Sequence, residues 1–350
     1  MYFASDNCGP ALPEIVQAIA DANTCYMPSY GNDLLMEEVQ TRIRDLFEAQ
    51  DAAVYLVATG TAANALALAT ITQPWQAIFC APLSHIQCDE CHAPEFFTGG
   101  AKLRLVGEGD KISPDDLSHE ISVLGHGNVH VSQHGPVALS QVTEMGHVYS
   151  LEELRALTSV AKQHGLTTYM DGARFANAVV SLGCTPAEMS WKAGIDVISF
   201  GGTKNGCIGV EAVIFFDPAQ AWEFELRRKR GAHLFSKHRF LSAQMLAYLL
   251  DNLWRKTASR ANAACTRLAA GLRDAPGVVF KNDPQANMIF ATLPRATHQR
   301  LHEAGAVYFM EGALSGEPVD EPLPMRLVCD WSVSDRQIDE FIKIVKMQGE

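Results

Sequence analysis

The sequence predicts an α/β fold, in which helices cover both faces of a sheet in a large domain, followed by a smaller α+β domain. Apolar runs typical of strands alternate with helical segments through the middle of the chain, as such a sheet requires. A helical stretch without proline follows at 236–272, and further short strands come after it. A chain of 350 residues suffices for two domains, which we place at 1–240 and 241–350.

Composition and charge exclude several classes of protein. Hydrophobic residues make up 47% of the chain and charged residues 19%, which does not fit a disordered or low-complexity chain. The formal net charge of −12 disfavours a nucleic-acid partner. No apolar run is long enough to span a membrane, and the N-terminal residues do not have the pattern of a signal peptide. Nine scattered cysteines are expected to be reduced thiols, so we expect a cytoplasmic protein.

The first strands and helices of the expected sheet follow one another from residue 53. Thr59-Gly60-Thr61 turns the first strand into a helix, and Pro114 opens another helix because proline is tolerated in a first helical turn. Ser150 and Glu153 have the spacing of a capping box, which predicts a helix from there to about His164. The expected strands are 53–58, 77–81, 102–106 and 137–141.

Two further strands deliver the most informative residues into turns. The run 166–170 ends at Asp171, and the run 196–200 leads into a glycine-rich turn that contains Lys204. Glycines leave little backbone bulk around that amine. An aldehyde cofactor with a basic ring nitrogen needs this pair, a lysine for a Schiff base and an aspartate for the pyridinium. Alternatively, they are unrelated surface residues at two strand ends.

The C-terminal third of the chain is expected to hold a connecting helix and a small domain. The stretch 236–272 is either one long helix or two abutting helices, and a strand at 210–216 precedes it. Later strands are expected at 287–292, 306–309 and 325–328, with a closing helix from Ser334.

Several other residues are candidates for binding an anion or a ring. Gly60 and Thr61 start a helix, where free amides and the helix dipole favour a phosphate, although an ordinary helix cap has the same pattern. His85 follows a strand and could lie against a ring, or be a core histidine. Arg326 could bind a carboxylate with two hydrogen bonds. The basic group 227–230, Lys237 and Arg239 is either a solvated helix face or a source of cations for an anionic cofactor.

Two motifs resemble metal sites, and we interpret neither as one. Cys88, Cys91 and His92 have the spacing of a haem attachment or half a zinc site, but no second close cysteine pair accompanies them. His126, His130 and His134 lie four residues apart, yet the glycines between them favour a loop rather than a helix. We therefore expect no metal.

Taken in order, the motifs resemble the threonine aldolases, enzymes of the type I fold class that depend on pyridoxal 5'-phosphate (PLP). The resemblance runs nearly end to end, and it is closest to the branch of phenylserine aldolase and the low-specificity L-threonine aldolases. It implies a mostly parallel seven-stranded sheet in the large domain. The motifs are Ser5-Asp6-Asn7, Tyr30-Gly31-Asn32-Asp33, Thr59 to Asn64, Ser84-His85-Ile86, Asp171 to Arg174, Thr203 to Gly206, and Arg326-Leu327-Val328.

The resemblance implies a role for each candidate. Lys204 would bind the cofactor aldehyde, Asp171 would pair with the ring nitrogen, and His85 would stack on the ring. Gly60 and Thr61 would hold the phosphate, with Arg239 adding a charge from a neighbouring subunit, and Thr203 would also bind the cofactor. The substrate carboxylate would be held by Ser5, Arg174, which also lies near the cofactor, and Arg326. Tyr30 would come from the partner subunit, which implies a homodimer or homotetramer with shared active sites.

The implied reaction is retro-aldol cleavage of an L-β-hydroxy-α-amino acid, such as threonine, allo-threonine or phenylserine, to glycine and an aldehyde. One position departs from the family pattern, because Glu144 stands where many threonine aldolases carry a histidine. The general base is therefore Glu144, His85 or water. The alternatives are another type I PLP enzyme, a β-eliminating lyase or an aminotransferase, and a non-catalytic PLP-binding protein.

Overall fold

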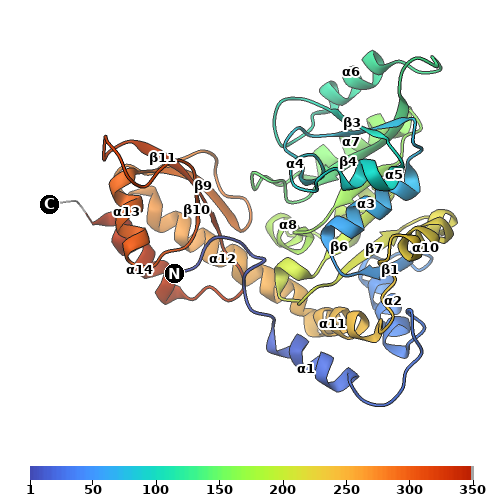
Figure 1. The fold of residues 1–350 in the computed structure, drawn as a ribbon, viewed down its shortest axis with the longest axis horizontal. Coiled ribbons are helices and arrows are strands. Elements are labelled where there is room, and N and C mark those ends of the chain that lie inside the picture. Colours follow the sequence, from blue (N-terminus) through green and yellow to red (C-terminus); the bar gives the residue numbers. More distant parts are fainter. Residues whose placement is uncertain (348–350) are drawn as a thin grey trace.

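Two sheets with their helices form the fold (Figure 1), which the computed structural model describes for residues 1–347. The strands are β1 (Ala53–Val57), β2 (Gln76–Cys80), β3 (Lys102–Leu105), β4 (Gln133–Ser140), β5 (Thr168–Asp171), β6 (Val197–Gly201), β7 (Glu211–Phe215), β8 (Val279–Phe280), β9 (Met288–Pro294), β10 (Phe309–Met310) and β11 (Pro322–Val328). The helices are α1 (Pro13–Ala22), α2 (Leu34–Leu46), α3 (Gly60–Ile71), α4 (His85–Cys88), α5 (Ala93–Thr98), α6 (Pro114–Leu124), α7 (Leu151–Gln163), α8 (Phe175–Leu182), α9 (Pro186–Met189), α10 (Ala221–Arg230), α11 (Arg239–Leu249), α12 (Leu253–Arg273), α13 (Arg295–Glu303) and α14 (Asp335–Lys346).

The large sheet has seven strands in the order β1-β7-β6-β5-β4-β2-β3. Only β7 runs antiparallel to its neighbours, β1 and β6, and all other neighbouring strands are parallel. The predicted α/β class and mostly parallel seven-stranded sheet are therefore confirmed. Because β1 is parallel to β6, the carboxyl ends of β1, β2, β4, β5 and β6 meet at one edge of the sheet, where ligands of such folds bind.

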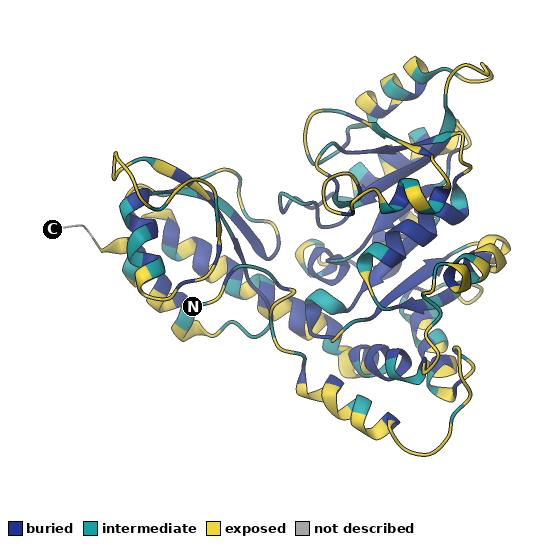
Figure 2. Ribbon diagram, in the orientation of Figure 1, coloured by how far each residue is buried: buried dark blue, intermediate teal, exposed yellow. Residues whose placement is uncertain are grey.

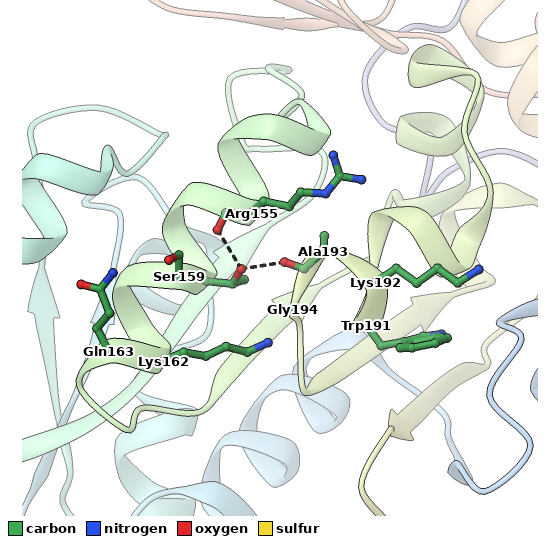
Figure 3. A pocket seen from close by; sticks show the side chains of 9 residues that line it. Arg155, Ser159, Lys162, Gln163, Trp191, Lys192, Ala193 and Gly194 are labelled. Atoms are coloured by element: carbon green, nitrogen blue, oxygen red, sulfur yellow. Dashed lines mark hydrogen bonds between the residues drawn. The ribbon is translucent and has the colours of Figure 1, made fainter.

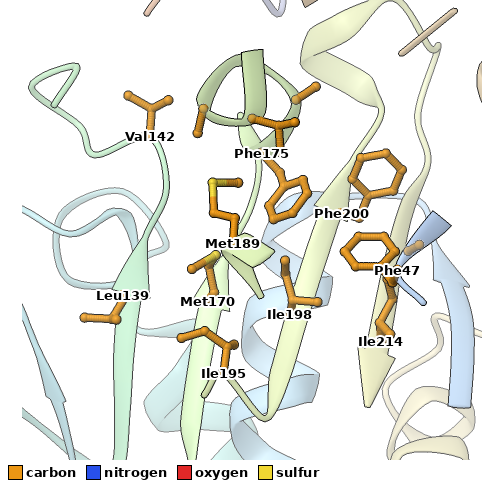
Figure 4. Packing of buried hydrophobic residues seen from close by; sticks show 14 of the residues in the cluster. Phe47, Leu139, Val142, Met170, Phe175, Met189, Ile195, Ile198, Phe200 and Ile214 are labelled. Carbon is orange, nitrogen blue, oxygen red and sulfur yellow. The ribbon is translucent and has the colours of Figure 1, made fainter. Parts of the chain in front are cut away.

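Alternating side chains of the strands supply two apolar cores, one on each face of the large sheet. In β7, Val213 and Phe215 pack with α3 and α10, whereas Ala212 and Ile214 pack with α2, α8 and α11 on the other face. This follows from the two-residue period of a strand. On the second face the rings of Phe47, Phe175 and Phe200 pack at centroid distances of 5.6 to 5.8 Å (Figure 4). The buried strands therefore lie between two layers of helices (Figure 2).

Helix α3 lies against the sheet and is buried without interruption from Ala62 to Thr70. Its alanines favour the helix and are small enough for close contact with the strands. The Thr59 hydroxyl caps it by accepting a hydrogen bond from the Ala62 amide at 3.2 Å. The helix starts at Gly60, so the amides of the predicted Thr59-Gly60-Thr61 turn belong to its N-terminus.

The predicted helical stretch 236–272 consists of two abutting helices, α11 and α12. They are separated at Leu250–Asn252, where Asp251 and Asn252 have positive φ angles of 50° and 55°. Such residues interrupt the regular α-helical backbone. Beyond this break α12 runs from the large sheet to the small sheet (Figure 1).

The small sheet has four antiparallel strands in the order β10-β11-β9-β8, with α12, α13 and α14 packed beside it. The predicted strand at 306–309 is shorter than expected, because only Phe309 and Met310 pair with β11. Val307 instead forms a bridge to Tyr2, and Phe3 is buried in the core of this sheet. Within residues 1–347, no helix is long and apolar enough to cross a membrane.

Candidate active site

One cavity collects most of the residues predicted to bind the cofactor. It has a volume of about 330 Å³ and lies at the edge where the parallel strands end. Asn7 of the N-terminal segment also borders it. Predicted site residues that line the cavity are Gly60, Thr61, His85, Asp171, Thr203 and Lys204.

Lys204 lies in a single 3-10 turn, Thr203–Asn205, directly after β6. Close packing holds this turn against the sheet, since a Cβ on Gly201 would lie 2.6 Å from the Ala173 carbonyl oxygen. Gly206 ends the turn with a φ of 107°, a conformation that side chains rarely adopt. The Thr203 hydroxyl donates to Glu211 at 2.5 Å and accepts from the Val210 amide at 3.2 Å. Its hydroxyl proton is therefore engaged within the chain.

Asp171, at the end of β5, is held by Asn64 of α3. The Asn64 amide nitrogen donates to the Asp171 carboxylate at 2.8 Å, and its oxygen accepts from the Tyr169 hydroxyl at 2.6 Å. The Ala173 backbone amide donates to the other carboxylate oxygen at 3.0 Å. Because Asp171 is buried, these donors hold its carboxylate in one orientation at the cavity wall.

His85 shares the same network through Glu90, which the sequence analysis did not single out. His85 Nδ1 lies 2.7 Å from Glu90 Oε1, and the Asn64 amide nitrogen donates to that oxygen at 2.6 Å. The hydrogen bond to Glu90 raises the pKa of the His85 imidazole by more than burial lowers it, and Asp171 and Glu144 raise it further. Burial raises the pKa of Glu90 despite its two hydrogen bonds. Both shifts make the pair retain its protons to higher pH.

Potential metal-ligating atoms of His85, Glu90 and Asp171 lie within 4.8 Å of one another. Within residues 1–347 they are the one group of three or more His, Cys, Asp or Glu side chains that could hold a metal ion. The Asn64 amide nitrogen donates to both carboxylates, so a hydrogen-bond donor occupies the place between them. The group is therefore a hydrogen-bonded network. The candidate motifs Cys88-Cys91-His92 and His126-His130-His134 form no group with metal-binding geometry among the described residues.

Arg174 is buried and pairs with Asp6 of the N-terminal segment. Its Nε and Nη2 donate to the two Asp6 carboxylate oxygens at 2.7 and 2.9 Å. Asn287 donates to the same carboxylate at 3.0 Å. Burial would raise the pKa of Asp6, but the positive charges of Arg174 and Lys204 hold it below its ordinary value. Two of the three guanidinium nitrogens are thus already engaged with a carboxylate.

A second cavity, of about 520 Å³, lies between the large sheet and the small sheet and contains Glu144 and Arg326. The Arg326 guanidinium lies over the Phe309 ring at 5.4 Å and donates to the Ala4 carbonyl at 3.3 Å, while its buried Nε has no hydrogen-bond partner. An unpaired guanidinium donor at a cavity can receive an anionic group. The wall is largely apolar and includes Leu83, Met145, Phe280, Phe290, Phe309 and Met325.

The remaining predicted residues lie outside both cavities. The Ser5 hydroxyl accepts from the Asn7 amide at 3.2 Å, next to the first cavity. Tyr30 is 42% exposed and borders a separate cavity of about 320 Å³. The Arg239 guanidinium donates to the Cys25 carbonyl at 2.8 Å. Tyr30 and Arg239 of one chain therefore do not line the cavity that contains Lys204.

The basic run 227–230 is not wholly the solvated face that its composition suggests. Arg228 is buried, lies over the Tyr55 ring at 5.0 Å and donates to the Leu56 carbonyl at 3.2 Å. Its guanidinium therefore packs against the edge of the large sheet. Burial lowers the pKa of Arg228.

Another basic concavity, of about 500 Å³, lies between α7 and the turn at Trp191–Gly194 (Figure 3). Thr158 connects its two walls by donating to the Ala193 carbonyl at 2.6 Å. Lys192 at its border already pairs with Glu48 at 2.6 Å. None of the predicted site residues lies there, and we assign this concavity no catalytic role.

Glu211 is a fully buried carboxyl at the wall of the first cavity. It stands at the start of β7, opposite Gly201, because β7 runs antiparallel to β6. Burial raises the pKa of Glu211 from its ordinary value of 4.5 to about 7, although Thr203 and Lys204 oppose the rise. The folded protein therefore retains this proton over a pH range in which the unfolded chain loses it.

The Glu211 pKa predicts how stability changes with pH. The contribution of the Glu211 proton to the free energy of unfolding is fully present below pH 4.5 and is lost as the pH rises through the folded-state pKa of about 7. Glu211→Gln removes the titration. The free energy of unfolding of the variant minus that of the wild type should therefore increase by roughly 3 kcal/mol between pH 4.5 and 8. Urea denaturation of the cofactor-free proteins measures this difference. The exposed Glu340→Gln serves as control, and a wild-type–Glu211→Gln difference independent of pH would contradict the expectation.

Sequence reasoning missed Asn64, Glu90 and Glu211 as individual residues. Weak signals for two of them exist, since Asn64 is the one amide in an otherwise alanine-rich apolar helix, and Glu211 is a charge at the start of an apolar strand. Glu90 lies within the Cys88-Cys91-His92 motif, which drew attention to metal chemistry instead. No local pattern indicated that its carboxylate meets His85.

The residues around the first cavity fit PLP. Lys204 supplies an amine, Asp171 a carboxylate fixed for a basic ring nitrogen, and His85 an imidazole at the same cavity. The amides at the start of α3 can accept a phosphate. A Cβ on Gly60 would meet no atom within 4 Å, so the space beside these amides is open. Such a donor set is what an aldehyde cofactor with a phosphate and a pyridine ring requires.

Comparisons with known proteins agree with this geometry. The sequence profile of the beta-eliminating lyase family matches residues 2–294. The low specificity L-threonine aldolase of Pseudomonas aeruginosa is 38% identical over 99% of this chain and 97% of its own length. A low specificity L-threonine aldolase of another Pseudomonas strain is also 38% identical, over 97% of this chain and 95% of its own.

Solved structures show the same relation. The Leishmania major threonine aldolase superposes with a TM-score of 0.90 and 26% identity, covering 99% of this chain and 98% of its own. The Sphingomonas wittichii serine palmitoyltransferase shares the fold, with a TM-score of 0.69 and 17% identity over 99% of this chain and 86% of its own. The chain therefore belongs to the beta-eliminating lyase family of PLP-dependent enzymes, in the branch of the low-specificity L-threonine aldolases.

Proposed function

We propose that this protein cleaves L-β-hydroxy-α-amino acids to glycine and an aldehyde, with PLP as cofactor. Threonine, allo-threonine and phenylserine are the expected substrates. The observation that carries the proposal is that Lys204 and the fixed Asp171 carboxylate line one cavity beside the open N-terminus of α3. Relatives that are 38% identical over nearly the whole chain and named low specificity L-threonine aldolases support this reaction.

Each residue of the first cavity has a task in binding. PLP, when bound, supplies an aldehyde that links to an amine and a ring that accepts electrons from the bond that breaks. Lys204 provides the amine that holds the cofactor between substrates. Asp171 would keep a proton on the ring nitrogen, and His85 would contact the ring. The amides of Gly60 and Thr61 at the N-terminus of α3 receive the phosphate, beside Thr203.

Orientation of the substrate decides which bond breaks. Arg326 holds the substrate carboxylate with its free guanidinium donors, assisted by Ser5 and the remaining nitrogen of Arg174. This clamp would orient the substrate so that the bond between its α- and β-carbons is the one that breaks. The β-hydroxyl proton would be taken by Glu144, by His85 or by a water molecule. The apolar wall near Glu144 then has room for a methyl or phenyl β-substituent.

Analysis of products tests this function against its alternatives. The PLP-loaded protein, incubated with threonine, allo-threonine or phenylserine, should release glycine and the matching aldehyde in equal amounts. Ammonia and a keto acid would indicate β-elimination instead. One equivalent of keto acid per bound PLP without ammonia, with the amino group transferred to the cofactor, would indicate transamination. A protein that binds PLP but forms no product would be a binding protein. Comparison of the three rates would also show whether a methyl or a phenyl substituent is preferred.

The active unit is a homo-oligomer with shared sites, and a dimer is the smallest such unit. Exposed Tyr30 and half-buried Arg239, neither of which lines the cavity of Lys204 in one chain, would enter the site of a neighbouring copy. Light scattering should therefore give at least twice the mass of 38.2 kDa, and a monomeric active enzyme would contradict this assembly.

The proposal also includes a cellular location and a division of the chain into two domains. Residues 1–240 form the cofactor-binding domain, and 241–350 form the connecting helix and a small domain that contributes Arg326. A cytoplasmic location fits the nine cysteines, all of which are free. Fractionation of the source cells tests the location, and limited proteolysis near residue 240 tests the domain boundary.

A further inference from the structure

A buried carboxylate that the proposed mechanism does not use, Glu90, contacts one of the residues that face the cofactor. Its side chain has 0% exposure, and Oε1 accepts from both His85 and Asn64 while Oε2 has no hydrogen-bond partner. Burying a carboxylate without full compensation is unfavourable, so such a group in a fold has a reason beyond packing. Glu90 follows α4, so a short segment of chain carries both members of the pair.

The geometry indicates which nitrogen of the neutral His85 ring carries the proton. Since Glu90 Oε1 lies 2.7 Å from Nδ1, the proton of a neutral imidazole belongs on Nδ1. Nε2 is then the nitrogen without a partner among the described residues, on a ring that lines the cofactor cavity. The Asn64 amide, which donates to Glu90 and to Asp171, fixes the carboxylate of Glu90 relative to the residue that faces the cofactor ring nitrogen.

We propose that Glu90 is a positioning residue that selects the tautomer of His85. It places the proton of the neutral ring on Nδ1 and leaves Nε2 to face the substrate side of the cavity. This assignment rests on the proposed aldol cleavage for its meaning in catalysis. The charged groups that raise the pKa of His85 are Glu90, Asp171 from β5, and Glu144 after β4, and all three are carboxyls. Glu90 is the one that bonds directly to the ring, so its removal should change the titration of His85 most.

A nitrogen NMR experiment on the PLP-loaded wild-type protein first tests which ring nitrogen of His85 carries the proton. With histidine labelled in both ring nitrogens, the signals of His85 among the 12 histidines are identified by their loss in His85→Asn. The expected result is a neutral ring with its proton on Nδ1. A proton on Nε2 of the neutral ring would overturn the assignment, and this measurement needs no substitution at Glu90.

The pH at which His85 titrates provides the second readout. Glu90→Gln keeps an acceptor oxygen but removes the negative charge, so the His85 midpoint should fall by about one pH unit. The control is Glu95→Gln, which alters the nearby pair of exposed His92 and partly buried Glu95 at 3.2 Å and should leave the His85 midpoint unchanged. An unchanged midpoint in folded Glu90→Gln would overturn the proposal.

Kinetics connect the titration to turnover. In Glu90→Gln the pH profile of kcat should move in the same direction as the His85 midpoint, while KM changes by less than about twofold. A uniform loss of kcat at every pH would indicate a structural role alone and count against the proposal. Because the NMR readouts do not depend on turnover, absence of aldol cleavage in the wild type would defeat the proposed function without deciding the arrangement of the pair.

Discussion

Lys204→Ala is expected to lower the rate of aldol cleavage by about 10⁴-fold or more, since no other lysine lines the first cavity. Losing the amine removes the one group there that can link covalently to an aldehyde. The absorbance of the bound cofactor should change in the same variant, because that absorbance depends on the covalent link. Stopped assays for glycine and a spectrum of each purified protein measure both effects.

Two controls separate the amine from its charge. Lys204→Arg keeps a cation at the position but supplies no amine that links to an aldehyde, so it should be nearly as inactive as Lys204→Ala. Lys192→Ala removes a lysine from the concavity on α7, and it should retain wild-type activity. Substantial turnover in Lys204→Arg would show that the covalent role lies elsewhere.

Asp171→Asn is expected to lower kcat by about 10³-fold with the protein still folded, because a neutral amide cannot stabilise a proton on the cofactor ring nitrogen. Its oxygen can still accept from Asn64, so the contact between β5 and α3 survives. PLP affinity should fall as well. Titration of the cofactor-free protein with PLP, followed by absorbance, separates weaker binding from slower chemistry at saturation.

The matching control for Asp171→Asn is Asp217→Asn, which changes an exposed aspartate that caps the short turn after β7. It should leave kcat and PLP affinity unaltered. If saturating PLP restored wild-type kcat to Asp171→Asn, the carboxylate would serve binding alone, and the electronic role assigned to it would be wrong.

Local patterns in the chain were sufficient to predict most elements of the large sheet. The capping box at Ser150 is present, with the Ser150 hydroxyl accepting from the Glu153 amide and the Glu153 carboxylate accepting from the Ser150 amide. Runs of apolar residues between turns identified β5 and β6, which end at Asp171 and lead into Lys204. These patterns are reliable because helix caps and short apolar runs depend on neighbours a few residues away.

Boundaries were less predictable where a distant partner sets them. The strand expected at 306–309 shrinks to β10, Phe309–Met310, because Val307 pairs with Tyr2 across 305 residues of chain. Arg228 provides another case, since its burial depends on the edge strand β1. A run of arginines and lysines has the same composition whether a fold covers it or not.

The sequence by itself determined the α/β class, the order of the motifs, and the pairing of a lysine with an aspartate that identifies the chemistry. Only the tertiary structure decided the network around them. Asn64 meets Asp171 across 107 residues, and Arg174 meets Asp6 across 168. The raised pKa of Glu211 and the orientation of His85 by Glu90 depend equally on burial at the sheet edge. Such contacts arise when parallel strands bring their ends together. Burial then strengthens each hydrogen bond and charge interaction, because the local dielectric is low.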